Sequence, residues 1–117
     1  MLIFLQLDSV RADQVYGMLR DAKFTRNQAK ILALLDQVPD VGITEITIYL
    51  GMSSSRASDS LKSLVRDGYL MSMDVKYVMG KGRSRKIYRL RMPVNEIAED
   101  FRSRVAIMIS FNNMIDP

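Results

Sequence analysis

The side chains of this sequence that are best suited to chemistry are cationic, and most of them lie in one third of the chain. Residues 53–91 contain ten basic and three acidic side chains, a net charge of +7, whereas the other seven basic and ten acidic side chains leave −3. No carboxylate occurs in residues 76–91. Positive charge concentrated in this way is typical of surfaces that bind polyanions such as nucleic acids. A solvated basic hairpin that binds nothing is the alternative that charge alone leaves open.

Several kinds of chemistry are excluded by composition. The sequence contains no His, no Cys and no Trp. It therefore has no Ser-His or Cys-His nucleophile pair, no zinc or haem site built from the usual ligands, and no disulfide. The one close group of carboxylates, Glu96, Glu99 and Asp100, has the spacing of ion pairs on a helix surface. We therefore expect neither an enzyme nor a bound cofactor or metal ion.

The length and composition are those of one folded domain. The chain has 117 residues, of which 48% are hydrophobic and 26% charged, enough apolar side chains for a buried core. The apolar segment at residues 1–5 has no basic residues before it and is followed too soon by polar residues to be a signal peptide. Residues 105–109 are apolar but too few to cross a bilayer. We expect a cytoplasmic protein that makes no membrane contact.

Two helices are predicted ahead of the basic stretch. Apolar residues at helical spacing predict the first over residues 9–22, and residues 1–7 either extend it or form a short strand. The second starts at a capping box, in which the side chains of Thr25 and Gln28 each accept from the backbone of the other. It stops before Pro39, because proline cannot continue a helix.

A short helix is expected next, followed by a longer one. Thr44 is expected to cap the short helix and Gly51 to end it. Ile48 is expected to pack against Ile43 in a hydrophobic staple, and a contact with a partner is the alternative.

The longer helix runs from its N-cap, Ser53, to about Arg66, and Gly68 lies just beyond its end. One of its faces is apolar, and the opposite face begins with short polar side chains and becomes basic. The apolar positions are Ala57, Leu61, Leu64 and Val65. Two helices joined by a tight turn that contains glycine form a helix-turn-helix pattern, whose second helix fits the major groove of B-DNA.

After Gly68 the hydrophobic period changes from 3.6 to 2, which predicts a β-hairpin. Alternating residues in 71–79 indicate a strand with one covered face. Residues 80–84 form a turn with two glycines, and residues 86–91 return as a second strand. The basic tip of this hairpin can lie along a nucleic-acid backbone or enter a minor groove.

The order of these elements is that of a known fold. In the segments TRNQAKIL (25–32), ITEI (43–46), LGMS (50–53), AS (57–58), DGYL (67–70) and GRSRKIYRL (82–90), with Leu61 and Leu64, the sequence resembles winged helix-turn-helix transcriptional regulators. It is most similar to the MarR and TrmB-like groups. The resemblance covers residues 24–92 and implies a mainly α fold with a small β-hairpin (α+β), with added N- and C-terminal helices. A short form without the long effector domain of TrmB-type sugar sensors is expected, and any small-molecule effector is unknown.

The resemblance also implies which residues contact DNA. Arg56 is the residue best equipped for bidentate pairing with guanine. Asp59 departs from the family pattern, and we expect it to form an ion pair with Lys62 or Arg56 on the same helix. The alternatives are that it accepts a hydrogen bond from a cytosine amine, or that it lowers the affinity for DNA. The expected contacts from the helix at about 53–66 are Ser53, Ser54, Ser55, Arg56, Ser58, Asp59 and Lys62. Those from the hairpin at about 75–87, the wing of this fold, are Lys81, Arg83, Arg85 and Lys86.

The C-terminal segment is expected to be a helix that dimerises. Its apolar stripe is broader than one small core can cover, and exposed it would be an unusually large patch for a monomer. Packing back on its own domain is the alternative. Asp100 with Arg104 and Glu99 with Arg102 are expected to be surface ion pairs. The positions expected in the dimer interface are Val94, Ile97, Phe101, Val105, Met108 and Phe111.

We therefore predict three parts: an N-terminal helical segment (1–23) that joins in dimerisation, a DNA-binding domain (24–92) and a dimerisation helix (93–117). The predicted function is that of a homodimeric regulator of transcription that binds double-stranded DNA in a sequence-specific manner. The alternative is a winged helix that binds RNA or a protein partner of the transcription or translation apparatus.

Overall fold

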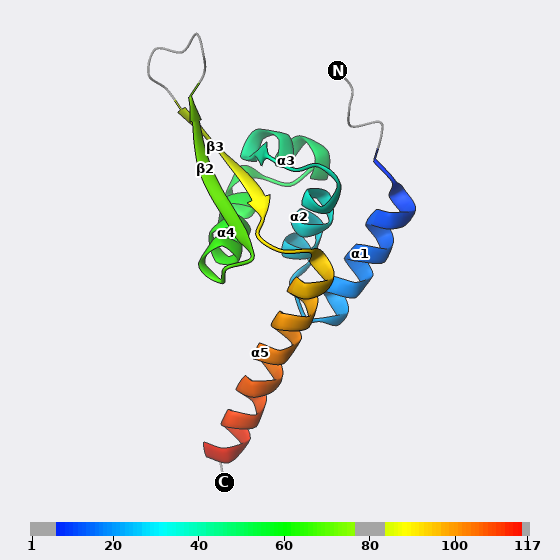
Figure 1. Cartoon of the computed structure of the whole chain (residues 1–117), viewed down its shortest axis with the longest axis vertical. Helices are drawn as coiled ribbons and strands as arrows, with labels where there is room; N and C mark the ends of the chain where they lie inside the picture. The colour runs from blue at the N-terminus through cyan, green and yellow to red at the C-terminus, as the bar shows by residue number, and fades with distance from the viewer. Residues whose placement is uncertain (1–6, 77–83, 116–117) are drawn as a thin grey trace.

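The computed structural model describes residues 7–76 and 84–115 of the chain. In Figure 1, the helices within residues 9–66 and the hairpin of residues 70–76 and 84–90 form one body, and the helix over residues 94–115 leads away from it. Our predictions for residues 1–6 and for the hairpin tip, which includes Lys81 and Arg83, lie outside the described residues. The elements, in order, are α1 (Ser9–Asp21), α2 (Arg26–Gln37), β1 (Val41–Gly42), α3 (Ile43–Leu50), α4 (Ser54–Arg66), β2 (Leu70–Lys76), β3 (Ser84–Leu90) and α5 (Val94–Ile115).

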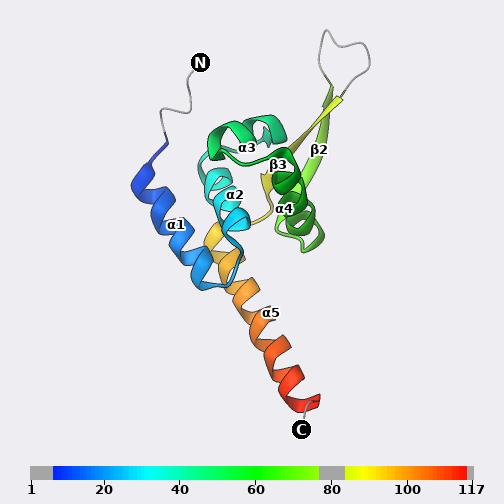
Figure 2. The ribbon, with the colours of Figure 1, turned by 180° about the vertical axis from the view of Figure 1, so that it is seen from behind.

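Helix α2 is the centre of the core. Its predicted capping box is confirmed: the backbone N–H of Gln28 donates to Thr25 Oγ1 at 3.2 Å, and that of Thr25 donates to Gln28 Oε1 at 3.1 Å. Views from both sides place α2 between α1 and α4 (Figures 1 and 2). Its buried residues are Ala29, Ile31, Leu32, Ala33, Leu34 and Leu35.

The start of α3 differs from our prediction. The helix begins at Ile43 with Gly42 as its N-cap, so Thr44 is not the cap. Gly42 is fixed in the N-cap position because β1 pairs with β3, a long-range contact that the local sequence does not reveal. The fourth helical position is consequently Ile46, which is fully buried, whereas Ile48 is 69% exposed. The predicted staple between Ile48 and Ile43 is therefore wrong.

The predicted boundaries of α4 are confirmed. Ser53 is its N-cap, and the Ser53 side chain accepts a hydrogen bond from the backbone N–H of Arg56 at 3.2 Å. Gly51 before the helix and Gly68 after it have φ values of 63° and 87°, in the left-handed region that favours glycine. Ala57, Leu61 and Leu64 are buried as expected, which leaves the polar face outward.

The three strands form an antiparallel sheet in the order β1-β3-β2. Leu70 pairs with Leu90 at the base of the hairpin, and Lys76 pairs with Ser84 at the far end of the described strands. Leu70 is buried, but Val75 is 42% exposed. The expected covered face is thus limited to the base, because the outer half of the hairpin extends beyond the helices (Figure 1).

Helix α5 packs on the domain through its first half only. Val94, Ile97 and Ala98 are buried, whereas every residue from 106 to 114 is exposed. We call residues 105–114 the α5 tip. The Cα radius of gyration is 16.0 Å and the extents are 61 × 34 × 24 Å. A compact domain of this length has a radius of gyration of about 13 Å, so the molecule is elongated.

Candidate nucleic-acid interface

The outer face of α4 presents the predicted contact residues to solvent. Six are exposed and Ser58 is half-buried. Helix α2 holds α4 from behind, where Gln28 Nε2 donates to Ser63 Oγ at 2.9 Å. Short hydroxyl side chains at a helix start can approach base edges or phosphates closely, and a guanidinium beside them can read guanine. The six exposed residues are Ser53, Ser54, Ser55, Arg56, Asp59 and Lys62.

A groove between α4 and the sheet brings three predicted contact residues together, Ser58, Lys62 and Lys86. It has a volume of about 300 Å³ and contains Lys62 and Arg66 from α4 and Lys86 from β3. Among the described residues, neither Lys62 nor Lys86 forms an ion pair. Both ammonium groups are therefore available to a phosphate. The remaining lining residues are Leu61, Val65, Ser72 and Tyr88.

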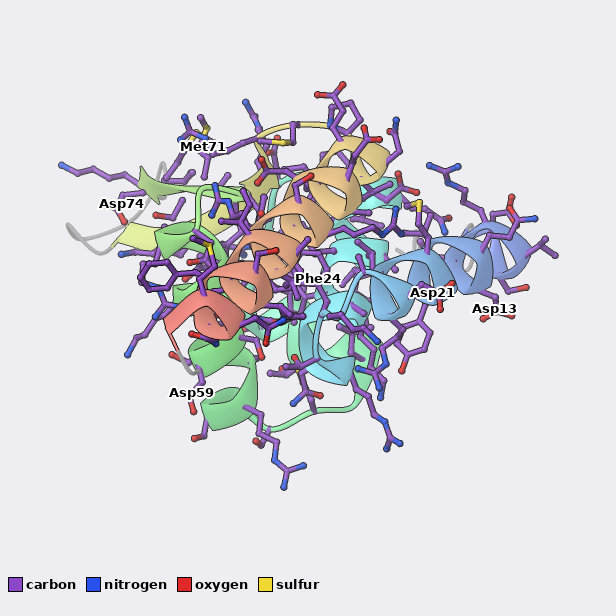
Figure 3. The ribbon with its side chains drawn as sticks, turned by 90° about the horizontal axis from the view of Figure 1, so that it is seen from below. Asp13, Asp21, Phe24, Asp59, Met71 and Asp74 are labelled. Carbon is purple, nitrogen blue, oxygen red and sulfur yellow. The ribbon has the colours of Figure 1, made fainter. Side chains whose placement is uncertain are left out.

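Asp59 is the one carboxylate on the exposed face of α4. Figure 3 shows it at the periphery of the molecule, pointing away from the helix. In the described part of the chain it has no ion-pair partner, so the expected pair with Lys62 or Arg56 is not formed. Its negative charge therefore faces outward, beside the cations.

Arg85, expected as a wing contact, instead forms an ion pair within the domain. Its guanidinium lies 2.9 Å from the carboxylate of Glu45 on α3. Burial alone would raise the pKa of Glu45, but backbone N–H donors, including that of Gly42, and Arg85 outweigh it and hold the pKa below its usual value. A Cβ on Gly42 would lie 2.9 Å from the Arg85 guanidinium, so glycine makes room for the pair.

A second ion pair of the same kind was missed by the sequence reasoning. Arg89 on β3 binds Asp40 through two hydrogen bonds, Nε to Oδ1 at 2.7 Å and Nη2 to Oδ2 at 2.8 Å. The hydrogen bond from Arg89 lowers the pKa of Asp40. Together the two pairs attach β3 to the segment around β1. Two cations of the basic stretch thus attach β3 to the rest of the domain, Arg89 near the base of the hairpin and Arg85 near the far end of its described strands.

No protein-family model and no curated protein sequence matches this chain. Its fold is similar to solved structures. One, a transcriptional regulator, has a TM-score of 0.58 and 19% identity over 92% of this chain and 70% of its own. Another, the adhesin competence repressor (AdcR) from Streptococcus pyogenes, has a TM-score of 0.51 and 20% identity over 92% of this chain and 76% of its own. A second crystal structure of AdcR gives the same TM-score over 93% and 81%. The chain has the fold of these transcriptional regulators.

The predicted winged helix-turn-helix architecture is thereby confirmed, with α3 and α4 as the helix pair and β2 and β3 as the wing. None of the described helices is long and apolar enough to cross a membrane. In the same residues, no three carboxylates come together in a way that could hold a metal ion.

The residues expected to dimerise fall into two groups. Val94 and Ile97 are 2% and 0% exposed, in the core of their own domain. Phe101 stacks on Phe24 with ring centroids 4.0 Å apart. Met108 and Phe111, in contrast, are 65% and 58% exposed. The expectation that Val94, Ile97 and Phe101 lie in a dimer interface is therefore wrong, because these residues pack on their own domain. Val105 is half-buried, and dimerisation through the exposed α5 tip stays a prediction.

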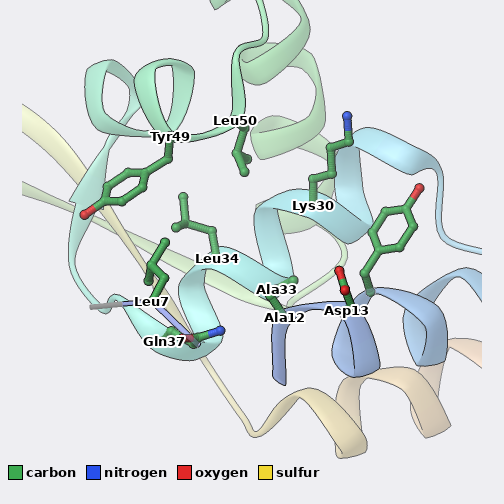
Figure 4. A pocket seen from close by; sticks show the side chains of 10 residues that line it. Leu7, Ala12, Asp13, Lys30, Ala33, Leu34, Gln37, Tyr49 and Leu50 are labelled. Carbon is green, nitrogen blue, oxygen red and sulfur yellow. The ribbon is translucent and has the colours of Figure 1, made fainter. Parts of the chain in front are cut away.

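A larger hollow lies on the other side of the domain, between α1, α2 and α3 (Figure 4). Its volume is about 410 Å³, in the range of small-molecule sites. Most of the lining is apolar, with Asp13 and Lys30 at the edge and the amide of Gln37 hydrogen-bonded to the backbone of Asp8. Because α2 separates this hollow from α4, it forms no part of the basic surface.

Proposed function

We propose that this protein is a homodimeric regulator of transcription that binds double-stranded DNA in a sequence-specific manner. Helix α4 is the recognition helix in the major groove, and the wing lies on the backbone or in the adjacent minor groove. No catalytic step is part of the proposal.

The observation that carries the proposal is the groove between α4 and the wing. Lys62 and Lys86, from elements far apart in the sequence, line one groove, and Arg56 is exposed nearer the start of the same helix as Lys62. Cations without an internal partner neutralise phosphates and fix the protein on the duplex, while side chains at the helix start read the bases. A solvated basic hairpin explains the charge but not this placement.

The α5 tip supports the dimer. No charged residue lies between Arg104 and Asp116, and five large apolar residues of the tip are more than half exposed. A patch of this kind marks a protein–protein contact. Two copies joined there would present two recognition helices, and such dimers bind half-sites about one helical turn apart. The five residues are Ile107, Met108, Ile109, Phe111 and Met114.

Selection of bound sequences from a random duplex pool tests the proposal. We expect enrichment of a pseudopalindromic site. Binding to that site should weaken steeply with salt: with ~6–8 phosphates neutralised per dimer, the log–log slope would be about −5 to −7. No enriched sequence together with a flat salt response would refute the proposal. Structured RNA that outcompetes duplex DNA in a gel shift would favour the RNA-binding alternative.

A further inference from the structure

The end of the recognition helix is tied directly to α5. Asp67 is the C-cap of α4, and Arg104 of α5 donates from Nη1 to the Asp67 carbonyl oxygen at 3.2 Å. The last carbonyl groups of a helix have no partner within the helix and carry its negative dipole end, so a guanidinium is well suited to this position. The cap comes from a different element, 37 residues along the chain.

Two further side chains complete this contact. The hydroxyl of Tyr69 donates to Asp100 Oδ2 at 2.6 Å, and Arg104 Nε lies 3.0 Å from the same oxygen. The Arg104 guanidinium also lies 5.2 Å from the centroid of the Tyr69 ring. Burial raises the pKa of Tyr69 well above its usual range, so the phenol stays protonated and remains a donor. The predicted pair of Asp100 and Arg104 is thus confirmed as part of a three-residue network.

Aromatic rings hold this network in a fixed position. The Tyr69 ring is fully buried and meets Phe24 edge to face, with centroids 5.7 Å apart. Phe101 of α5 stacks on Phe24 and meets Tyr69 edge to face at 6.1 Å. Figure 3 shows Phe24 beneath α5, close to the middle of the molecule. Rings packed in this way leave little freedom for α5 to turn relative to the end of α4.

The angle between α4 and α5 determines where the N-terminal end of α4 lies. The helix has 13 residues, so it is about 20 Å long. A tilt of about 10° around its C-terminal end would move its N-terminal end by about 3.4 Å, the spacing of one base pair. The residues that read bases lie at that N-terminal end. In a dimer joined through α5, the same tilt in both copies changes the distance between the two recognition helices.

We propose that Tyr69, Asp100 and Arg104 are positioning residues that fix α4 relative to α5 and so determine which spacing between half-sites the dimer selects. This inference rests on the proposed function. None of the three residues is expected to touch DNA.

The test uses the full chain and a duplex library in which two copies of the selected half-site are separated by spacers of different length. The variants are Arg104→Gln, which alters an exposed side chain, and Tyr69→Phe, which keeps the packed ring and removes only the hydroxyl. Arg102→Gln is the matched control, because it makes the same change of charge at an exposed position of α5 and Arg102 forms no ion pair with the described residues. Thermal unfolding of each variant is recorded beside the selection.

We expect the wild type and Arg102→Gln to prefer one spacer by at least about tenfold over its neighbours, the equivalent of about 1.4 kcal/mol. Arg104→Gln and Tyr69→Phe should lose most of that preference while selecting the same half-site sequence. If both variants keep the wild-type spacer and only bind every duplex more weakly, the residues merely stabilise the fold and the inference is overturned. If the wild type enriches no duplex at all, the proposed function fails, and the inference fails with it.

Discussion

Replacing Ile107 by glutamate should separate the proposed dimer without unfolding the protomer. Ile107 lies in the α5 tip, and the residue is 69% exposed. Substitutions at exposed positions usually change the free energy of unfolding by less than about 0.5 kcal/mol. In a dimer with two-fold symmetry, however, the interface contains two copies of the substituted residue, so each effect on association counts twice.

The magnitude follows from the surface that association would cover. Full burial of an isoleucine side chain is worth about 1.5–3 kcal/mol. With 69% of the residue exposed, burial in the dimer contributes about 1–2 kcal/mol per copy, or about 2–4 kcal/mol for the pair. The dissociation constant should therefore rise by at least about 30-fold, and desolvation of the new carboxylates adds to this loss.

Sedimentation equilibrium over a range of protein concentrations measures the dissociation constant. Ile48→Glu is the matched control, because Ile48 is also an isoleucine that is 69% exposed, but it lies on α3. We expect Ile48→Glu to dimerise like the wild type. Thermal unfolding of both variants shows whether the protomer remains folded.

Three results would refute this reasoning. An unchanged dissociation constant for Ile107→Glu would mean that the dimer forms through another surface. Equal weakening by Ile48→Glu and Ile107→Glu would mean that the added charge, rather than the covered face of α5, governs association. A wild-type protein that sediments as a monomer at every concentration would remove the dimer from the proposal altogether.

Three further predictions concern α4, α3 and the turn between them. Arg56→Ala should relax sequence preference at the base it reads by about 1–3 kcal/mol, whereas Lys62→Ala should weaken binding to all duplexes alike and reduce the salt slope by about one; binding curves at several salt concentrations separate the two. Gly51→Ala should lower the free energy of unfolding in urea by about 1 kcal/mol, because its φ of 63° is unfavourable for alanine although no atom lies within 4 Å of the added Cβ. An unchanged midpoint would contradict this account. Glu45→Gln should reduce stability at pH 7, and the reduction should disappear on acidification. The pKa of Glu45 is lowered in the folded state, so the carboxylate stabilises the fold above its unfolded pKa of about 4.3 and loses this effect as the pH falls through the folded pKa. Urea unfolding at pH 7 and pH 3 measures the change, and a difference that stays constant with pH would contradict it.

The parts of the fold that could be predicted from the sequence are those set by neighbouring residues. The capping box of Thr25 and Gln28 and the cap of α4 at Ser53 each involve residues three apart, so the spacing of residue types reveals them. The start of α3 could not be predicted in this way. It depends on the pairing of Gly42 with Ile87, which lies 45 positions further along the chain.

In the candidate site, too, features set by local spacing could be predicted from the sequence, and features that depend on distant residues could not. The exposed face of α4 follows from helical periodicity, which predicts the placement of Arg56 and Lys62. The role of Arg85 does not, because it depends on Glu45, 40 residues away in the sequence. Periodicity also identifies an apolar face without identifying what covers it. Ile97 and Met108 belong to the same apolar stripe, yet one is buried in its own domain and the other is 65% exposed.

The projection of the α5 tip also has a consequence for amide hydrogen exchange. The tip is rich in β-branched, aromatic and asparagine residues, which are weak helix formers, and its residues 106–114 are all exposed in the single protomer. Its amide protons should therefore exchange with solvent through local fraying, at a free-energy cost far below that of global unfolding. Association would protect the same amides by mass action. Protection of these backbone groups would then rise with protein concentration, while the amides of α2 in the core would exchange at a rate independent of it.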